Sequence, residues 1–176
     1  MGASLAAGCG EEESIVSYRV PKEPMPTAGV VTAGAQRDVP RWKLPEGWRE
    51  VGREQNTMRY ATIEVGEGPP LTLTVMALPA QNLSANLARW AQQVGMTPND
   101  PDDLTNAVRR VQAGPFAANM ADLTGPSSRI LAALVDHEGM CWSFKLQGEP
   151  RRVGAEKPRF EAFVASIRFA PEGENR

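Results

Sequence analysis

The segment Ile130–Gln147 reads I-L-A-A-L-V-D-H-E-G-M-C-W-S-F-K-L-Q. Residues 130–135 form a continuous apolar run, which is typical of a central strand that is covered on both faces. Residues 136–139 contain Asp, Glu and Gly and predict a tight turn. From Met140 onward apolar and polar residues alternate, which predicts a second strand. A strand, a tight turn and another strand make an antiparallel pair, so this segment predicts the centre of an antiparallel sheet.

Three more strands are predicted upstream of this pair. Residues 116–123 are strand-like and lead into the pair through a turn rich in Gly, Pro and Ser. Residues 58–65 and 71–78 both alternate between apolar and polar side chains, and the Gly- and Pro-rich residues 66–70 between them predict a hairpin.

Helical periodicity appears between and after these strands. A stripe that ends before Gly95 predicts an amphipathic helix; its members are Leu83, Leu87, Trp90, Ala91 and Val94. A short helix is predicted from Asp100, and residues 108–112 after it fit either the end of that helix or a strand. A last helix is predicted with Pro158 near its start and with an apolar stripe that must pack on the sheet, made of Phe160, Phe163, Val164 and Ile167. The predicted fold class is therefore α+β, an antiparallel β-sheet layered with α-helices.

Composition limits the classes of function. The chain has 176 residues, of which 41% are hydrophobic and 23% charged, and its formal net charge is −2. This length suits one domain with a tail. The charge argues against a nucleic-acid partner, because neutralising phosphates requires clustered Lys and Arg. One His and two Cys exclude most zinc sites and a disulfide framework. No apolar run approaches the ~18 residues of a membrane-spanning helix.

The N-terminal residues predict a membrane tether. Residues 1–9 read M-G-A-S-L-A-A-G-C and look like the end of a bacterial lipoprotein signal, in which Cys9 is the lipid anchor. Residues 10–40 contain several Pro and Gly and predict an extended arm. The body is predicted to span 41–170 and to be followed by a tail, residues 171–176.

One part of this arm differs from a plain spacer. Residues 15–20 read I-V-S-Y-R-V, so Ile15, Tyr18 and Val20 are candidate partner-binding residues. An edge strand of the body is an equally good interpretation of the same residues.

Catalytic and metal-binding chemistry is poorly supported. Asp136, His137 and Glu138 are the only cluster of metal-ligand types, but three adjacent residues of a tight turn cannot all face one point. Cys141 lies within a strand and is interpreted as a buried thiol. A nucleophile and a base cannot be assembled around a single histidine. The sequence therefore predicts no enzyme, no cofactor and no metal.

Two pairs of arginines are candidate contacts with a partner, because arginine is enriched at protein interfaces and at lipid headgroups. They are Arg109 with Arg110, and Arg151 with Arg152. Trp42 and Trp48 are interpreted as side chains that cover the edge of the core, since large aromatic residues are mostly buried.

The body resembles a family of uncharacterised bacterial envelope lipoproteins with a PsbP-like α/β/α domain. The residues that carry the resemblance are spread over nearly the whole body: Trp42, Pro45–Trp48, Met58–Arg59, Asn86–Trp90 with Gln93, Asp122–Gly125, Arg129–Leu131, Trp142–Gly148 and Phe160–Phe163. Residues 18–23 of the arm also look like a segment of the bacterial group. Because the link to PsbP-like proteins concerns the fold alone, no functional residue is transferred from it.

The resemblance implies a non-enzymatic accessory subunit. PsbP-like proteins are typically extrinsic subunits or assembly factors of membrane energy-conversion complexes. We therefore expect a lipid-anchored protein on the periplasmic, extracytoplasmic side of the bacterial cell envelope, docked on an integral membrane protein complex, photosynthetic or respiratory. The alternative is a soluble periplasmic binding module that holds a small apolar ligand between sheet and helix, in a pocket lined by Trp142, Phe144 and Phe163.

Overall fold

The computed structural model describes residues 37–53, 58–79, 83–97 and 101–171. The predicted anchor at Cys9 and the candidate partner-binding residues Ile15, Tyr18 and Val20 lie outside these ranges.

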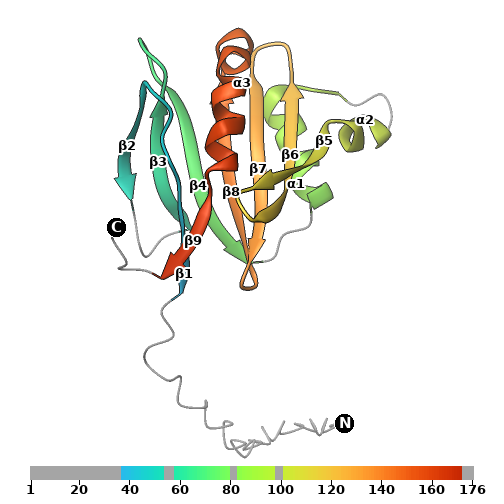
Figure 1. Ribbon diagram of the computed structural model, residues 1–176. Coiled ribbons are helices and arrows are strands. Elements are labelled where there is room, and N and C mark those ends of the chain that lie inside the picture. The colour runs from blue at the N-terminus through green and yellow to red at the C-terminus, as the bar shows by residue number, and fades with distance from the viewer. Residues whose placement is uncertain (1–36, 54–57, 80–82, 98–100, 172–176) are drawn as a thin grey trace, which may run out of the picture. The chain divides into compact units, whose positions relative to one another are not determined.

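An antiparallel sheet dominates the described part of the chain, with seven strands in the order β2-β3-β4-β8-β7-β6-β5 (Figure 1). The strands are β2 (Trp48–Arg53), β3 (Arg59–Val65), β4 (Leu71–Pro79), β5 (Val108–Ala113), β6 (Phe116–Thr124), β7 (Arg129–His137) and β8 (Met140–Gly148). The predicted hairpin β3–β4 and the meander β6–β7–β8 are both present. Residues 108–112, which fitted helix and strand equally, form β5.

The central hairpin is confirmed as the middle of the sheet. Ile130–Val135 of β7 are all buried, which matches a strand that is covered on both faces. His137 pairs with Met140 across a two-residue turn. Both turn residues have positive φ, 48° at Glu138 and 75° at Gly139, as a tight hairpin with right-handed twist requires.

Helix α3 (Pro150–Ala165) covers one face of the sheet. Its Phe160, Phe163 and Val164 are buried, as the predicted apolar stripe requires, whereas Ile167, also buried, lies beyond the end of the helix. The predicted start near Pro158 is wrong, because Pro158 lies inside the helix. The helix begins earlier because the Glu149 carboxylate accepts hydrogen bonds from the backbone N–H groups of residues 151 and 152, and Pro150 needs no such partner in the first turn.

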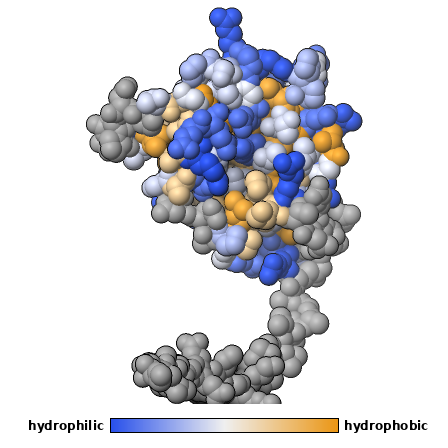
Figure 2. Space-filling model, turned by 180° about the vertical axis from the view of Figure 1, so that it is seen from behind, coloured by the Kyte–Doolittle hydropathy of each residue, from blue (hydrophilic) through white to orange (hydrophobic). Residues whose placement is uncertain are grey.

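Two helices lie on the opposite face, α1 (Leu83–Val94) and α2 (Pro101–Asn106). Leu87, Trp90 and Val94 of α1 pack on β6 and β7. The body is therefore a helix–sheet–helix sandwich over β6 and β7. On β2, β3 and β4 no described helix covers this second face, and Figure 2 shows that hydrophilic side chains predominate on this side of the molecule. None of the described helices is long and apolar enough to cross a membrane.

A separate two-stranded ribbon joins the two ends of the body. Strand β1 (Asp38–Arg41) pairs antiparallel with β9 (Arg168–Pro171), a strand that follows α3 and that the sequence pattern did not predict. Val39 of β1 is buried in the main core.

Candidate functional site

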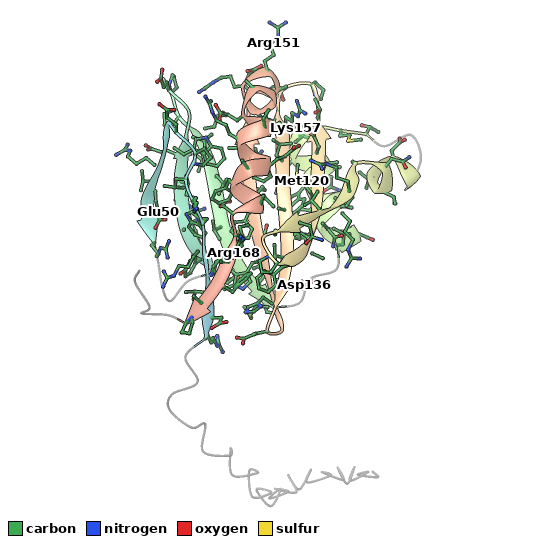
Figure 3. All side chains as sticks on the ribbon, viewed as in Figure 1. Glu50, Met120, Asp136, Arg151, Lys157 and Arg168 are labelled. Carbon is green, nitrogen blue, oxygen red and sulfur yellow. The ribbon has the colours of Figure 1, made fainter. Side chains whose placement is uncertain are left out.

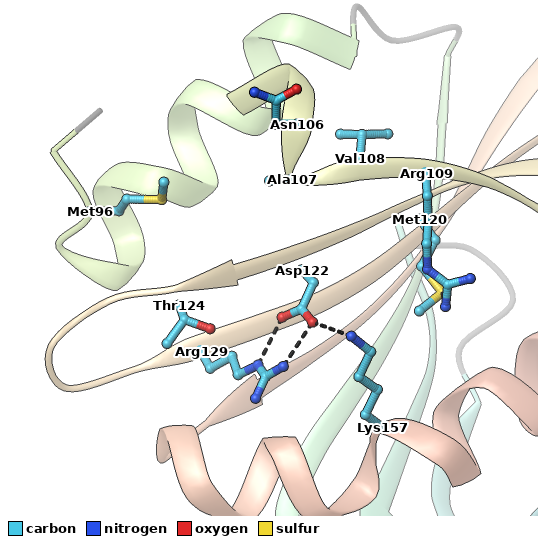
Figure 4. A pocket seen from close by; sticks show the side chains of 10 residues that line it. All are labelled: Met96, Asn106, Ala107, Val108, Arg109, Met120, Asp122, Thr124, Arg129 and Lys157. Atoms are coloured by element: carbon cyan, nitrogen blue, oxygen red, sulfur yellow. Dashed lines mark hydrogen bonds and ion pairs between the residues drawn. The ribbon is translucent and has the colours of Figure 1, made fainter. Parts of the chain in front are cut away.

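A cleft of about 490 Å³ opens beside α3, at the end of the sheet where β5 and β6 lie (Figure 4). Strands β5, β6 and β7, helix α3 and the segments that follow α1 and α2 all contribute to it. The lining residues are Met96, Asn106, Ala107, Val108, Arg109, Met120, Asp122, Thr124, Arg129 and Lys157.

Three charged side chains form a network in the cleft, which we call the charged triad: Asp122, Arg129 and Lys157. The Nε and Nη2 atoms of Arg129 each donate to one carboxylate oxygen of Asp122, both at 2.8 Å. Lys157 of α3 donates to Oδ2 of the same carboxylate at 2.7 Å. The triad therefore connects two neighbouring strands to the helix that covers them.

Glycine allows the arginine of this triad to lie against the helix. A Cβ atom at Gly154 would lie 2.6 Å from Nη1 of Arg129, which is closer than side chains approach one another. The absence of a side chain at this point of α3 thus leaves room for the guanidinium group.

The triad fixes the charge of the cleft. Burial alone raises the pKa of Asp122, but the hydrogen bonds from Arg129 and Lys157 together lower it below its usual value. The pKa of Arg129 is raised, mainly by its hydrogen bond to Asp122. Asp122 is therefore ionised at neutral pH, and the lining carries three cationic groups, counting Arg109, against one carboxylate.

Of the four predicted arginines, the structure brings only Arg109 into the cleft. Its guanidinium group contacts Sδ of Met120 at 3.7 Å and pairs at the rim with Glu161 of α3. The neighbouring Arg110 is exposed, does not line the cleft, and points to the other face of β5 because side chains alternate along a strand.

The other two arginines lie at the start of α3, where Figure 3 labels Arg151. The side chain of Arg152 donates to the backbone oxygen of Pro69 at 2.6 Å. Their backbone N–H groups cap the helix through Glu149 and hold the pKa of that carboxyl below its usual value. Neither residue lines the cleft, so the two predicted pairs do not form one site.

Sequence reasoning missed the charged triad. Its members come from two strands and a helix, and periodicity within a segment does not report which segments meet. One signal was present, since Asp122 is the only charged residue of β6. A charged group at such a position needs a partner, because an unpaired half-buried charge is costly.

The lining of the cleft combines cationic and apolar side chains. Among the described residues that line the cleft, Thr124 supplies the only side-chain hydroxyl, and none is His or Cys. His137 lies at the opposite end of β7 from Arg129, roughly 26 Å away at the usual rise of a strand. The lining offers cationic donors for an anionic group and two methionines for apolar contact.

The interior between the sheet and α3 is filled by aromatic side chains. Phe144 and Phe163 are fully buried, and their ring centroids lie 5.9 Å apart. Trp42 packs against Phe163 at 5.8 Å, and buried Trp48 donates its ring N–H to Glu156 at 2.9 Å. These contacts support the interpretation that both tryptophans cover the edge of the core. Phe144 and Phe163, two of the three side chains of the predicted ligand pocket, are thus enclosed by neighbouring side chains.

Comparison with known proteins shows the fold. No family model matches the sequence, and no curated protein matches it significantly. The described domain is similar to the solved structure of LpqN, a protein involved in cell envelope biogenesis of Mycobacterium tuberculosis. The TM-score is 0.52 and the sequence identity 12%, and the match covers 80% of this chain and 88% of that chain. The α+β fold class predicted from the sequence is confirmed, and the resemblance to bacterial envelope proteins is confirmed at the level of the fold.

Two further solved structures have lower TM-scores. A structure from Bacteroides thetaiotaomicron has 10% identity and a TM-score of 0.48 over 78% of this chain and 47% of that chain. The cyanobacterial PsbP protein CyanoP from Synechocystis sp. PCC 6803 has 14% identity and a TM-score of 0.47 over 82% of this chain and 99% of that chain.

Proposed function

We propose that this protein is a non-enzymatic accessory subunit of the bacterial cell envelope. In this proposal the chain is lipid-anchored at Cys9 on the extracytoplasmic side and docks on an integral membrane protein complex, photosynthetic or respiratory. The fold shared with LpqN, which is described as involved in cell envelope biogenesis, is consistent with this location.

The observation that carries the proposal is the cationic cleft. Arg129 and Lys157 bind the Asp122 carboxylate, and Arg109 at the rim, which pairs with Glu161, keeps about half of its side chain exposed. Such a cleft favours an acidic side chain of a partner, because a charge-assisted hydrogen bond to an arginine is stronger than one between neutral groups. The apolar surface of Met96 and Met120 beside the cations suits the stem of that side chain.

Charge reversal at the rim tests the docking. Membranes that contain a tagged full chain are solubilised in mild detergent, and the proteins that co-purify are identified. Arg109→Glu should lose the partner, since it places a like charge opposite the partner's acidic group. Arg110→Glu is the matched control, because it makes the same change at the next residue, outside the cleft.

Each outcome decides the proposal. Loss of the partner with Arg109→Glu alone supports docking through the cleft. Unchanged co-purification with both variants contradicts it. Equal loss with both variants assigns docking to the basic edge of β5 and also contradicts the role of the cleft.

The arm is proposed to add a second contact through Ile15, Tyr18 and Val20. Tyr18→Ala combined with Val20→Ser should weaken co-purification while leaving the melting temperature of the body unchanged. Replacement of residues 27–39 by a Gly/Ser sequence is the control for a plain spacer, and it should preserve binding. If the double variant binds normally and melts early, the segment is an edge strand instead.

The anchor is tested separately. Cys9→Ser in the full-length gene should move the protein from the membrane to the periplasmic fraction, because lipid chains supply the hydrophobic part of membrane binding. Retention of the variant on salt-washed membranes would show that the covalent anchor is not what holds the protein.

A further inference from the structure

A second group of polar residues meets at the end of the sheet opposite the cleft. Asp38, the first residue of β1, lies beside His137 and Glu138 at the β7–β8 turn. One nitrogen or oxygen atom from each of the three side chains lies within 4.8 Å of the others. Adjacent residues of the turn cannot converge on one point by themselves, but β1 supplies a third group from the other side.

The imidazole ring of His137 is held in place by two aromatic rings. Phe169 of β9 stacks on it, with centroids 4.1 Å apart and an angle of 22° between the planes. Phe116 of β6 contacts it edge-on at 5.1 Å. The direction of the ring nitrogens is therefore fixed before any ligand binds, which lowers the entropic cost of binding.

The Nε2 atom of His137 is buried and has no hydrogen-bond partner among the described residues. It lies 3.5 Å from Oδ2 of Asp38, without the geometry of a hydrogen bond. A buried nitrogen in this state costs free energy, so an additional group that satisfies it is expected.

The separation of these two atoms fits a shared metal ion. Two ligands that each lie ~2.0–2.1 Å from a tetrahedral zinc ion are about 3.4 Å apart. The exposed Glu138 at the tip of the turn needs to move closer by no more than about 1.4 Å to complete the set, since the three atoms lie within 4.8 Å of one another.

We propose that Asp38, His137 and Glu138 bind a divalent transition-metal ion such as Zn²⁺. One imidazole nitrogen and two carboxylate oxygens favour zinc over magnesium or calcium, which bind oxygen ligands. The ion connects β1, the first strand after the N-terminal arm, to the central hairpin β7–β8. The sequence argues against a metal at Asp136–Glu138 because three adjacent turn residues cannot face one point and no second histidine is present; in the structure Asp38 of β1 takes the place of Asp136.

Calorimetry with Zn²⁺ tests the site directly. The full chain is prepared without a histidine tag, stripped with EDTA and titrated with zinc chloride. We expect about one ion per chain and a rise in melting temperature that EDTA reverses. Co²⁺ is the second probe, because its visible absorption becomes intense when nitrogen and oxygen ligands surround it tetrahedrally.

Variants identify the ligands. Asp38→Asn and His137→Gln should each weaken zinc binding at least about tenfold, since each removes one ligand. Asp136→Asn is the matched control: this exposed residue, labelled in Figure 3, belongs to the same hairpin but not to the cluster, and its variant should bind as the wild type does. If His137→Gln disturbs the aromatic packing, Asp38→Asn decides the question. Absence of zinc binding by the wild type, or equal binding by all three variants, overturns the proposal.

Discussion

Helix α3 covers two regions that are built from opposite kinds of side chain. Towards its C-terminal end, Phe160 and Phe163 close over an aromatic interior in which every ring is in contact with another. Beside its middle, Lys157 meets a carboxylate and a guanidinium group and borders the cleft. The same helix on the same sheet face therefore provides a packed region and a charged region.

The difference indicates how the fold combines stability with binding. Apolar burial contributes free energy without regard to pH or salt over the neutral range, and it leaves no space for a ligand. Ion pairs contribute less free energy, and their contribution depends on pH, but they keep charged groups at a surface where a partner can bind them. Substitutions in the two regions should therefore differ both in size and in dependence on conditions.

The largest effect is expected in the aromatic region. Phe163→Ala removes a fully buried ring that contacts Trp42, Trp48 and Phe144. Such truncations cost ~3–5 kcal/mol. Thermal unfolding should show a melting temperature lowered by roughly 10 °C at this chain length. A fall of less than about 2 °C would contradict the role of this ring as a main element of the core.

The next largest effect is expected in the charged triad. Asp122→Asn leaves two cationic side chains without their shared carboxylate, at a site where each triad member keeps between a fifth and two fifths of its side chain exposed. We expect a loss of about 2 kcal/mol in the free energy of unfolding, less than for a fully buried pair because water reaches the groups. Urea unfolding at pH 7 measures it.

The stability contributions of the two regions should differ most in their dependence on acid pH. The pKa of Asp122 is lowered in the folded protein, so its contribution to stability is present above the unfolded pKa near 4 and disappears as pH falls through the lower folded value. The stability difference between wild type and Asp122→Asn should therefore be constant from pH 7 to about 5 and shrink below about 4. The difference caused by Phe163→Ala should stay constant over the same range. A parallel decline of both would remove the distinction between the regions.

The smallest effect is expected on the uncovered face of the sheet. Arg49 pairs with Glu64 across β2 and β3, but 74% of the arginine side chain is exposed. Exposed pairs contribute little, so Arg49→Ala should change the free energy of unfolding by less than ~0.5 kcal/mol, and added salt should reduce even that. A loss above about 1 kcal/mol would show that this face is structurally important.

Local sequence patterns predicted the strands and helices better than they predicted which of these elements are in contact. The hairpin 58–78 and the central strands follow from alternation and turn residues, and the structure confirms them. The start of α3 was misplaced because Pro158 was treated as a start signal, whereas the cap at Glu149 determines it.

The candidate sites depend on contacts between distant segments, which alternation and helical spacing do not report. Arg109 could be singled out as a basic residue, but its companions Asp122, Arg129 and Lys157 come together only through strand pairing and the docking of α3. The approach of Asp38 to His137 likewise depends on the β1–β9 ribbon, whose second strand was not predicted.

Site-directed photocrosslinking tests the central claim, docking through the cleft, most directly. A benzophenone amino acid is placed at Thr124, which lines the cleft, or at Val51, an exposed residue of β2 at the far edge of the sheet. Irradiation of intact membranes should yield an adduct with an integral membrane protein from position 124 and none from position 51. An adduct from position 51 without one from position 124 would contradict the account.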